Sequence, residues 1–187
     1  MAYTLSNMLP LGTKAPDFTL EDVTDRKMKS LADLKSDKAT VVMFICNHCP
    51  YVIHLIRDIV DTANEYIEKG VSFVAISPND VDYAPDDSPD KMRLIAKVLQ
   101  FPFPYLYDES QEIAKAYDAA CTPDFYIFDH TMELVYRGQY DDSRPKKDVP
   151  VTGKDFREAL DAVLSGEGVP ARQVPSGGCN IKWKTNV

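Results

Sequence analysis

The feature that most constrains the fold is a cysteine pair placed between a buried strand and a long helix. Residues 39–45 (ATVVMFI) form an apolar run rich in β-branched side chains, which predicts a strand buried on both faces. The run ends directly at Cys46-Asn47-His48-Cys49. From Pro50 to Lys69 apolar residues recur with helical spacing, and Gly70 follows as a stop signal. A strand that continues into a helix through a cysteine pair indicates an α/β fold with chemistry at the junction.

The other patterns alternate between strand and helix, which is the rhythm of an α/β fold. Strands are expected within 11–20 and at 71–76, 105–107, 124–129 and 134–137, and helices at 88–98, 111–117 and after Thr152. The last two strands are separated by a tight turn and predict a hairpin. Thr152 and Asp155 resemble a capping box at the start of the final helix, which Gly166 ends. We expect a central mixed sheet of five strands flanked by helices.

Length and charge narrow the class of protein. A chain of 187 residues, 44% of them hydrophobic, can build one domain with a sizeable core. The net charge of -8 disfavours binding to nucleic acid or an anionic membrane surface, because phosphates are neutralised by a basic face. Met1–Pro10 has no signal-peptide pattern, and no apolar run approaches about 18 residues. We therefore expect a cytoplasmic protein, in which four cysteines serve chemistry rather than a disulfide scaffold.

The spacing C-x-x-C suits reversible exchange between two thiols and a disulfide. We expect Cys46 at the helix N-terminus, where free N–H groups and the helix dipole stabilise a thiolate. An exposed Cys46 would attack a substrate disulfide, and Cys49 would resolve the mixed disulfide. His48 would favour the thiolate as a cation or hydrogen-bond donor, and Asn47 adds a small polar side chain.

Two other interpretations use the same residues. The cysteines could be ordinary core residues beside a solvent-facing His48, or Cys46, His48 and Cys49 could bind a metal with Cys121 or Cys179 as a further ligand. No second C-x-x-C and no H-x-x-x-H completes a tetrahedral set in the sequence. We therefore expect neither a metal nor a cofactor.

Two motifs, CNHCPYV and PSGGCNIKWK, together with the Thr122-Pro123 pair in CTPDFYIFD, carry a family resemblance. Over roughly residues 10–165 the chain resembles the thioredoxin superfamily, in the redoxin branch related to alkyl hydroperoxide reductase and thiol-specific antioxidant proteins. It is similar there to thioredoxin-family proteins described as peroxiredoxin-like. The resemblance implies a thioredoxin-like domain over 1–168, with GTKAPDFTL in the N-terminal redoxin hairpin and 169–187 as a C-terminal strap packed on it. It also implies that Pro123 is cis and that Thr122 and Pro123 form the wall facing the substrate.

The chain departs from the peroxidase pattern P-x-x-x-T/S-x-x-C of this branch. Counting back from Cys49 places Cys46 at the hydroxyl position and Val42 at the proline position. The arginine of that pattern would fall near Thr122-Pro123, where neither residue replaces a guanidinium. The thioredoxin sequence W-C-G-P-C is absent as well, because Ile45 precedes the first cysteine. These departures favour disulfide exchange over peroxide reduction.

The two remaining cysteines and an acidic loop have less specific sequence patterns. Cys121 precedes Thr122 and is expected to be buried and inert. Cys179 follows two glycines, which suggests an exposed, mobile turn and an additional resolving or regulatory thiol. The acidic loop 78–90 lacks the spacing of a Ca²⁺ loop and is expected to be a solvated edge.

The sequence thus predicts a thiol–disulfide oxidoreductase that acts through Cys46 and Cys49 in redox homeostasis. Its expected partners are protein or small-molecule disulfides and thiols, and an unidentified reductant. One alternative is an antioxidant thiol peroxidase that uses the same cysteines. The other is a metal-binding or redox-sensing partner protein without turnover.

Overall fold

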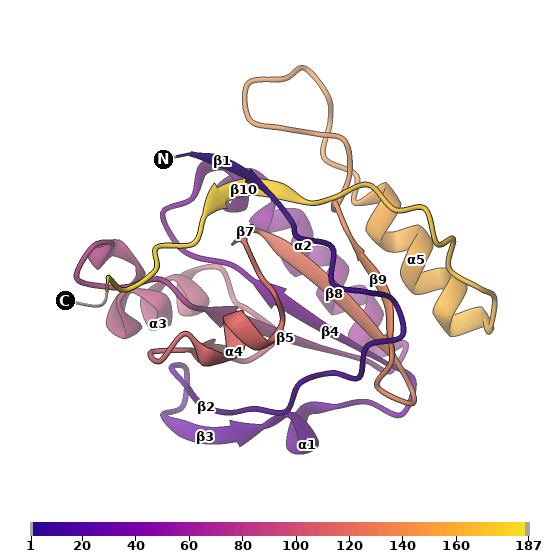
Figure 1. Ribbon diagram of the computed structural model, residues 1–187, viewed down its shortest axis with the longest axis horizontal. Coiled ribbons are helices and arrows are strands. Elements are labelled where there is room, and N and C mark those ends of the chain that lie inside the picture. Colours follow the sequence, from indigo (N-terminus) through magenta and orange to yellow (C-terminus); the bar gives the residue numbers. More distant parts are fainter. Residues whose placement is uncertain (1, 186–187) are drawn as a thin grey trace.

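In the computed structural model, which describes residues 2–185, two β-sheets and five α-helices build the fold (Figure 1). The larger sheet has seven strands, in the order β3 (Lys27–Ser30), β2 (Thr19–Asp22), β6 (Tyr105–Tyr107), β5 (Val71–Ser77), β4 (Ala39–Phe44), β8 (Asp124–Asp129) and β9 (Leu134–Gly138). Strand β4 pairs in parallel with β5 and antiparallel with β8, so the sheet is mixed, as expected. The expected number of five strands is wrong, because the N-terminal hairpin β2–β3 extends the sheet beyond β6.

Helices cover both faces of this sheet. The helices α2 (Pro50–Glu68), α3 (Pro89–Val98) and α5 (Lys154–Ser165) pack on one face, and the short helices α1 (Leu31–Leu34) and α4 (Glu112–Ala116) pack on the other. Every residue of β4 is buried, with Val41 and Met43 in the first core and Val42 and Phe44 in the second. The apolar run at 39–45 is therefore the centre of the molecule, as its composition predicts.

The start of α5 differs from the sequence prediction. The expected capping box of Thr152 and Asp155 does not form. The N-cap is Gly153, in a left-handed conformation with φ 60°, and no side chain makes a cap hydrogen bond there. The Asp155 carboxylate instead accepts a hydrogen bond from Gln139 Nε2 at 2.6 Å. A polar partner from the neighbouring loop has thus replaced the local cap.

A second sheet joins the two ends of the chain. It consists of β1 (Tyr3–Leu5), β10 (Gly177–Asn180) and β7 (Cys121–Thr122), all antiparallel, with β10 in the middle (Figure 1). Its register places Cys179 beside both Tyr3 and Thr122. The expectation of an exposed, mobile turn at Cys179 is wrong, since this residue lies in a strand and is 3% exposed.

None of the helices in the described part of the chain is both long and apolar enough to cross a membrane.

Candidate active site: three thiols at the start of helix α2

The cysteine pair lies in the loop between β4 and α2. The chain stays hydrogen-bonded to β5 as far as Ile45, which delivers Cys46 directly beyond the sheet. Cys49 is the N-cap of α2, and its carbonyl accepts a hydrogen bond from the Ile53 N–H at 2.9 Å. Pro50 is the first helical residue, a position where its missing N–H costs nothing. The strand and the helix thus fix both ends of the loop.

Both cysteines are buried: Cys46 is 1% exposed and Cys49 is 0% exposed. The expectation of an exposed Cys46 at the helix N-terminus is therefore wrong. The helix begins at Pro50, so Cys49 and not Cys46 occupies the terminal position. Thr122 and the segment that ends at Asp87 contact the loop and shield it from solvent.

Cys49 is surrounded by groups that stabilise its thiolate. A hydrogen bond from the Cys46 thiol is the largest influence, and it lowers the pKa of Cys49 to about 5 although burial opposes this. The Cys179 thiol and the backbone N–H groups of Val52 and Cys179 act in the same direction. The sulfur of Cys49 lies 2.7 Å from that of Cys179 and 3.2 Å from the carbonyl oxygen of Thr122. The donors at Cys49 are thus the Cys46 and Cys179 thiols and the two backbone N–H groups, whereas the Thr122 carbonyl oxygen accepts.

The pKa of Cys46 is shifted in the opposite direction. Its hydrogen bond to Cys49 raises the pKa of the Cys46 thiol, and burial and the charge of Asp87 raise it further. The Cys46 sulfur also lies 3.4 Å from Thr122 Oγ1 and 4.0 Å from His48 Nδ1. The two pKa shifts run in opposite directions, so within the pair deprotonation is favoured at Cys49 over Cys46.

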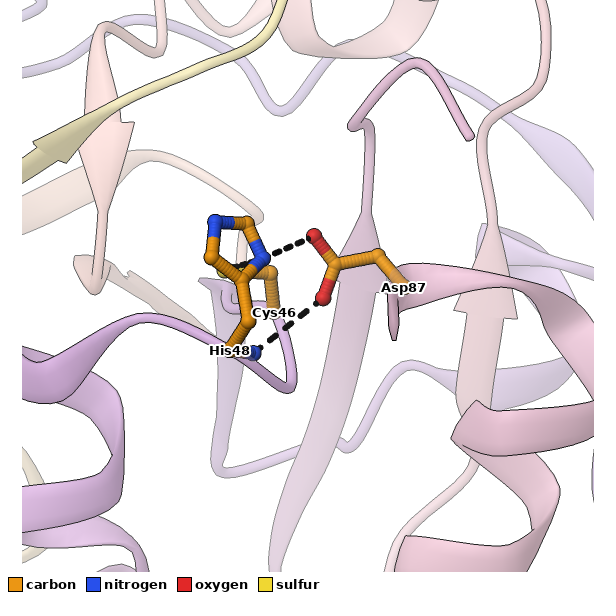
Figure 2. Close-up of side chains that lie close together, drawn as sticks. All are labelled: Cys46, His48 and Asp87. Atoms are coloured by element: carbon orange, nitrogen blue, oxygen red, sulfur yellow. Dashed lines mark hydrogen bonds and ion pairs between the residues drawn. The ribbon is translucent and has the colours of Figure 1, made fainter. Parts of the chain in front are cut away.

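A buried carboxylate holds the loop between the two cysteines. Asp87 comes from the short 3-10 helix η1 (Pro85–Asp87) and accepts hydrogen bonds from the backbone N–H groups of Asn47 at 2.7 Å and His48 at 3.3 Å. Its other oxygen lies 2.6 Å from His48 Nδ1 (Figure 2). The same oxygen lies 2.7 Å from Asn79 Nδ2. The expectation of a solvated acidic edge is thus wrong for Asp87, which is 0% exposed.

Asp87 and Asn79 are the site residues that sequence reasoning misses. Asn79 also accepts a hydrogen bond from the Lys182 N–H at 2.9 Å, so it connects the loop to the C-terminal tail. One signal could have found this region. Loop 78–90 follows β5, and because β5 runs parallel to β4, both strands end at the same edge of the sheet.

The structure also places the two supporting polar side chains of the loop. His48 directs Nδ1 at Asp87 rather than mainly at a sulfur, so its contact with Cys46 is secondary. The Asn47 side chain turns away from the cysteines: its Nδ2 donates to the carbonyl of Asp86 at 2.9 Å and its Oδ1 accepts from the Tyr105 hydroxyl at 3.2 Å. Both residues therefore shape the loop.

The Thr122–Pro123 peptide bond is cis, as the family resemblance implies. Thr122 contacts both cysteines of the pair, with its hydroxyl facing Cys46 and its carbonyl facing Cys49. The neighbouring Cys121 is 0% exposed, and burial raises the pKa of its thiol. Its sulfur lies 3.6 Å from the carbonyl oxygen of Pro123, on the backbone rather than on another thiol.

A cavity of about 250 Å³ opens beside Cys46. Its polar lining comes from Cys46, Asn47 and Arg57, and the rest is apolar: Ile45, Val52, Ile53, Ile56, Ile95, Leu99, Phe101 and Tyr105. Ile53 at its edge is 58% exposed. The cavity gives a small or narrow substrate a route to Cys46, whereas Cys49 is not among the lining residues.

The group of side chains that could bind a metal differs from the expected one. Cys46, His48 and Asp87 each offer one ligand atom, and these atoms lie within 4.8 Å of one another (Figure 2). Cys49, the third ligand expected from the sequence, faces Cys179 instead.

Comparisons with known proteins show the family and the fold. The AhpC/TSA family matches residues 11–137. An uncharacterized conserved protein from Geobacillus kaustophilus is 59% identical, with a TM-score of 0.98 over 100% of this chain and 99% of that one. A hypothetical protein from Sinorhizobium meliloti 1021 is 45% identical, with a TM-score of 0.95 over 98% and 100%.

A more distant structure shares the fold. A thiol:disulfide interchange protein of the thioredoxin family from Chlorobium tepidum TLS is 22% identical, with a TM-score of 0.63 over 82% of this chain and 97% of that one. The fold is thus thioredoxin-like, as predicted. No curated protein sequence matches the chain.

Proposed function

Because this chain belongs to the AhpC/TSA family, we propose that it is a thiol–disulfide oxidoreductase whose reacting groups are Cys46 and Cys49. The observation that carries the proposal is that both sulfurs of the pair contact the same residue, Thr122, while Cys46 also lines a cavity. Cys49 is stabilised as a thiolate by the donors around it, and Cys46 is held as a thiol beside it. A nucleophilic thiol and its base are thus in direct contact.

The pair can reduce a disulfide in two steps. In the first, the Cys46 sulfur attacks one sulfur of the substrate disulfide, the Cys46 proton passes to Cys49, and the second substrate sulfur leaves as a thiolate. In the second, Cys49 gives this proton to the departing thiolate and attacks the Cys46 sulfur. The bond between Cys46 and the substrate breaks, the substrate sulfur that was attacked first leaves as a thiolate, and the two electrons have moved from the dithiol to the substrate.

The cavity determines which cysteine meets the substrate. Cys46 lines it and Cys49 does not, so entry by way of Cys46 fits the access that the fold allows. The apolar lining favours a disulfide with an apolar body, and Arg57 at the same cavity favours an anionic group on it. A protein or small-molecule thiol restores the reduced pair by the reverse reaction.

Disulfide formation in defined redox buffers tests this proposal. In the Cys179→Ser variant, which leaves the pair alone, we expect oxidised glutathione to remove two hydrogens and peptide mapping to find Cys46 linked to Cys49. Cys121→Ser is the control variant, because Cys121 contacts the backbone. If no link between Cys46 and Cys49 forms at any ratio of oxidised to reduced glutathione, the proposal fails. Rapid consumption of hydrogen peroxide instead would favour the peroxidase alternative.

A pair of tryptophan substitutions tests the role of the cavity. Ile53 lines it, while Leu94 on α3 does not, and both are 58% exposed. We expect Ile53→Trp to slow the reaction of the reduced protein with a chromogenic aromatic disulfide by about tenfold, since it narrows the route to Cys46. Leu94→Trp should react at the wild-type rate. Equal rates in both variants would show that substrate reaches the pair by another route.

The grouping of Cys46, His48 and Asp87 favours metal binding as a second candidate function. A thiolate, an imidazole and a carboxylate suit Zn²⁺, with a fourth position left for water or substrate. Native mass spectrometry after addition of Zn²⁺ separates this candidate from the first. One bound ion that is lost in Cys46→Ser would support it, and a metal-free wild-type spectrum would contradict it.

A further inference from the structure

Cys49 has two sulfur neighbours, which come from different segments of the chain. Cys46 approaches from the loop after β4, and Cys179 approaches from β10 at a sulfur–sulfur distance of 2.7 Å. This distance lies within hydrogen-bonding range for two sulfur atoms. Disulfide exchange requires a thiol to approach one sulfur of an existing disulfide. Cys179 already holds that position for any disulfide that contains Cys49.

The sequence before Cys179 accounts for this close approach. A side chain at Gly178 would overlap the carbonyl oxygen of Thr122, and one at Gly177 would overlap the Tyr3 hydroxyl. A glycine at 178 therefore allows β10 to lie this near to β7, because the backbone of Thr122 cannot give way as the end of the Tyr3 side chain can. The register that follows sets Cys179 opposite Thr122, whose carbonyl oxygen lies 3.2 Å from the Cys49 sulfur.

The strand is also held at its far end. The Ile181 N–H donates to the carbonyl of Ala120 at 3.2 Å, and the Lys182 N–H donates to Asn79, which in turn donates to Asp87. The residues that flank Cys179 are thus tied to the same carboxylate that holds the loop between Cys46 and Cys49. The hydrogen bonds of the site thus hold the strand that carries Cys179.

We propose that Cys179 is a third redox thiol, and that the oxidised protein exchanges between a Cys46–Cys49 disulfide and a Cys49–Cys179 disulfide. This deepens the proposed function and rests on it. In the exchange Cys179 attacks the Cys49 sulfur, the new bond between Cys49 and Cys179 forms, and the bond to Cys46 breaks. The proton of Cys179 passes to the released Cys46 sulfur. Two electrons remain missing from the cluster throughout, so no outside oxidant or reductant takes part.

The exchange has a chemical consequence at the cavity. When the disulfide lies between Cys49 and Cys179, Cys46 is again a thiol beside the cavity. Cys46 can then form a mixed disulfide with a second substrate, which the two-thiol mechanism does not allow in the oxidised state. The class of ligand for this state is a disulfide with an apolar body, as for the first step.

The Cys46→Ser variant tests the inference directly, because it leaves Cys49 with one sulfur neighbour. We expect oxidised glutathione to remove two hydrogens from this variant and peptide mapping to link Cys49 to Cys179. Wild type, oxidised in the same way and quenched with acid, should contain both disulfides. Cys121→Ser should behave as wild type, and Cys49→Ser should form neither disulfide. Absence of the Cys49–Cys179 peptide from either Cys46→Ser or wild type overturns the inference.

The outcomes distinguish this inference from the proposed function. If Cys179→Ser fails to form Cys46–Cys49 while Cys46→Ser forms Cys49–Cys179, the proposed pair is wrong and the third thiol is real. If Cys179→Ser forms its disulfide and Cys46→Ser gains only glutathione, the pair stands and the third thiol is wrong. Circular dichroism of each variant shows whether the serine substitutions leave the fold intact.

Discussion

At the scale of single residues, the position of the thiolate is decided by donors that are distant in sequence. The local pattern places a cysteine pair before a helix, and from this alone the first cysteine is expected to be the acidic one. The structure gives the lowered pKa to Cys49, because the Cys46 thiol, Cys179 and the Val52 N–H all donate to it. Cys179 lies 130 residues away from Cys49, so no spacing rule near the pair could reveal it.

A pH titration of the reduced protein checks this assignment. We expect the ultraviolet absorbance of a thiolate to rise with a midpoint near pH 5, since the pKa of Cys49 is lowered to about 5. The step should vanish in Cys49→Ser and persist in Cys121→Ser. A wild-type titration that shows its first step only near the value of a free thiol, about 8.5, would contradict the assignment.

Asp124 is a second residue whose surroundings have a measurable effect. It is 0% exposed, its Oδ1 has no partner among the described residues, and burial raises its pKa to about 7. The folded state therefore holds a proton that the unfolded state releases above about pH 4. As pH rises from about 4 to about 7, this residue should lower the free energy of unfolding by roughly 4 kcal/mol.

The substitution Asp124→Asn removes this titration. In urea unfolding, the free energy of unfolding of the variant should fall less than that of wild type as pH rises through this interval. Below the interval, the two free energies of unfolding should show a similar dependence on pH. Asp148→Asn, at an exposed position, serves as the control. If wild type and Asp124→Asn show the same dependence on pH, the buried carboxyl is not protonated in the folded protein.

At the scale of elements, the long periodic segments are predictable and the short strands are not. The run 39–45, the helix after Pro50 and the hairpin β8–β9 appear where their patterns predict them, because burial on one or two faces dictates those patterns. Strand β10 has the sequence GGCN, which lacks both alternation and β-branched residues. It is a strand because β1 and β7 supply partners on both edges, and tertiary pairing overrides its weak local preference.

The glycines of β10 provide an element-scale prediction. In Gly178→Ala the new methyl group meets the backbone of Thr122, so β10 must move away from β7. We expect the share of Cys49–Cys179 disulfide to fall severalfold and the free energy of unfolding to fall by about 1 to 3 kcal/mol.

Gly168→Ala is the matched control, because no atom lies within 4 Å of its added methyl group. It should change the stability by less than about 0.5 kcal/mol and leave the disulfides unchanged. An equal share of Cys49–Cys179 disulfide in the two alanine variants would show that β10 needs no close approach.

At the scale of the whole molecule, the site is assembled from four separate segments. The cysteine loop, Asp87, Thr122 and Cys179 meet because β4, β5 and β7 end at one side of the molecule and β10 returns to it. The fold class and the cysteine pair could be predicted from local patterns and from family motifs. The role of Asp87 could not, since it depends on the path of a loop whose composition suggests solvent, and neither could the buried position of Cys179 in a strand beside Cys49.

Removal of residues 169–187 tests how far the molecule depends on its tail. The tail supplies the middle strand of the second sheet and the fully buried Ile181. We expect the shortened chain to lose at least about 2 kcal/mol of unfolding free energy and its Cys49 to react faster with alkylating reagents. Val174→Ala, at a tail side chain that is 54% exposed, should retain wild-type behaviour. Unchanged stability of the shortened chain would contradict a structural role for the tail.

The position of β10 late in the sequence also determines the order in which the residues of the site are synthesised. Ribosomes make proteins from the N-terminus, so Cys49 is synthesised 130 residues before Cys179, roughly 10 s earlier at ordinary rates. During that interval the nascent chain has a cysteine pair but no third sulfur, and Thr122 has no strand beside it. Newly made protein should therefore differ chemically from mature protein. Until β10 is made and pairs with β1 and β7, Cys49 cannot form a disulfide with Cys179.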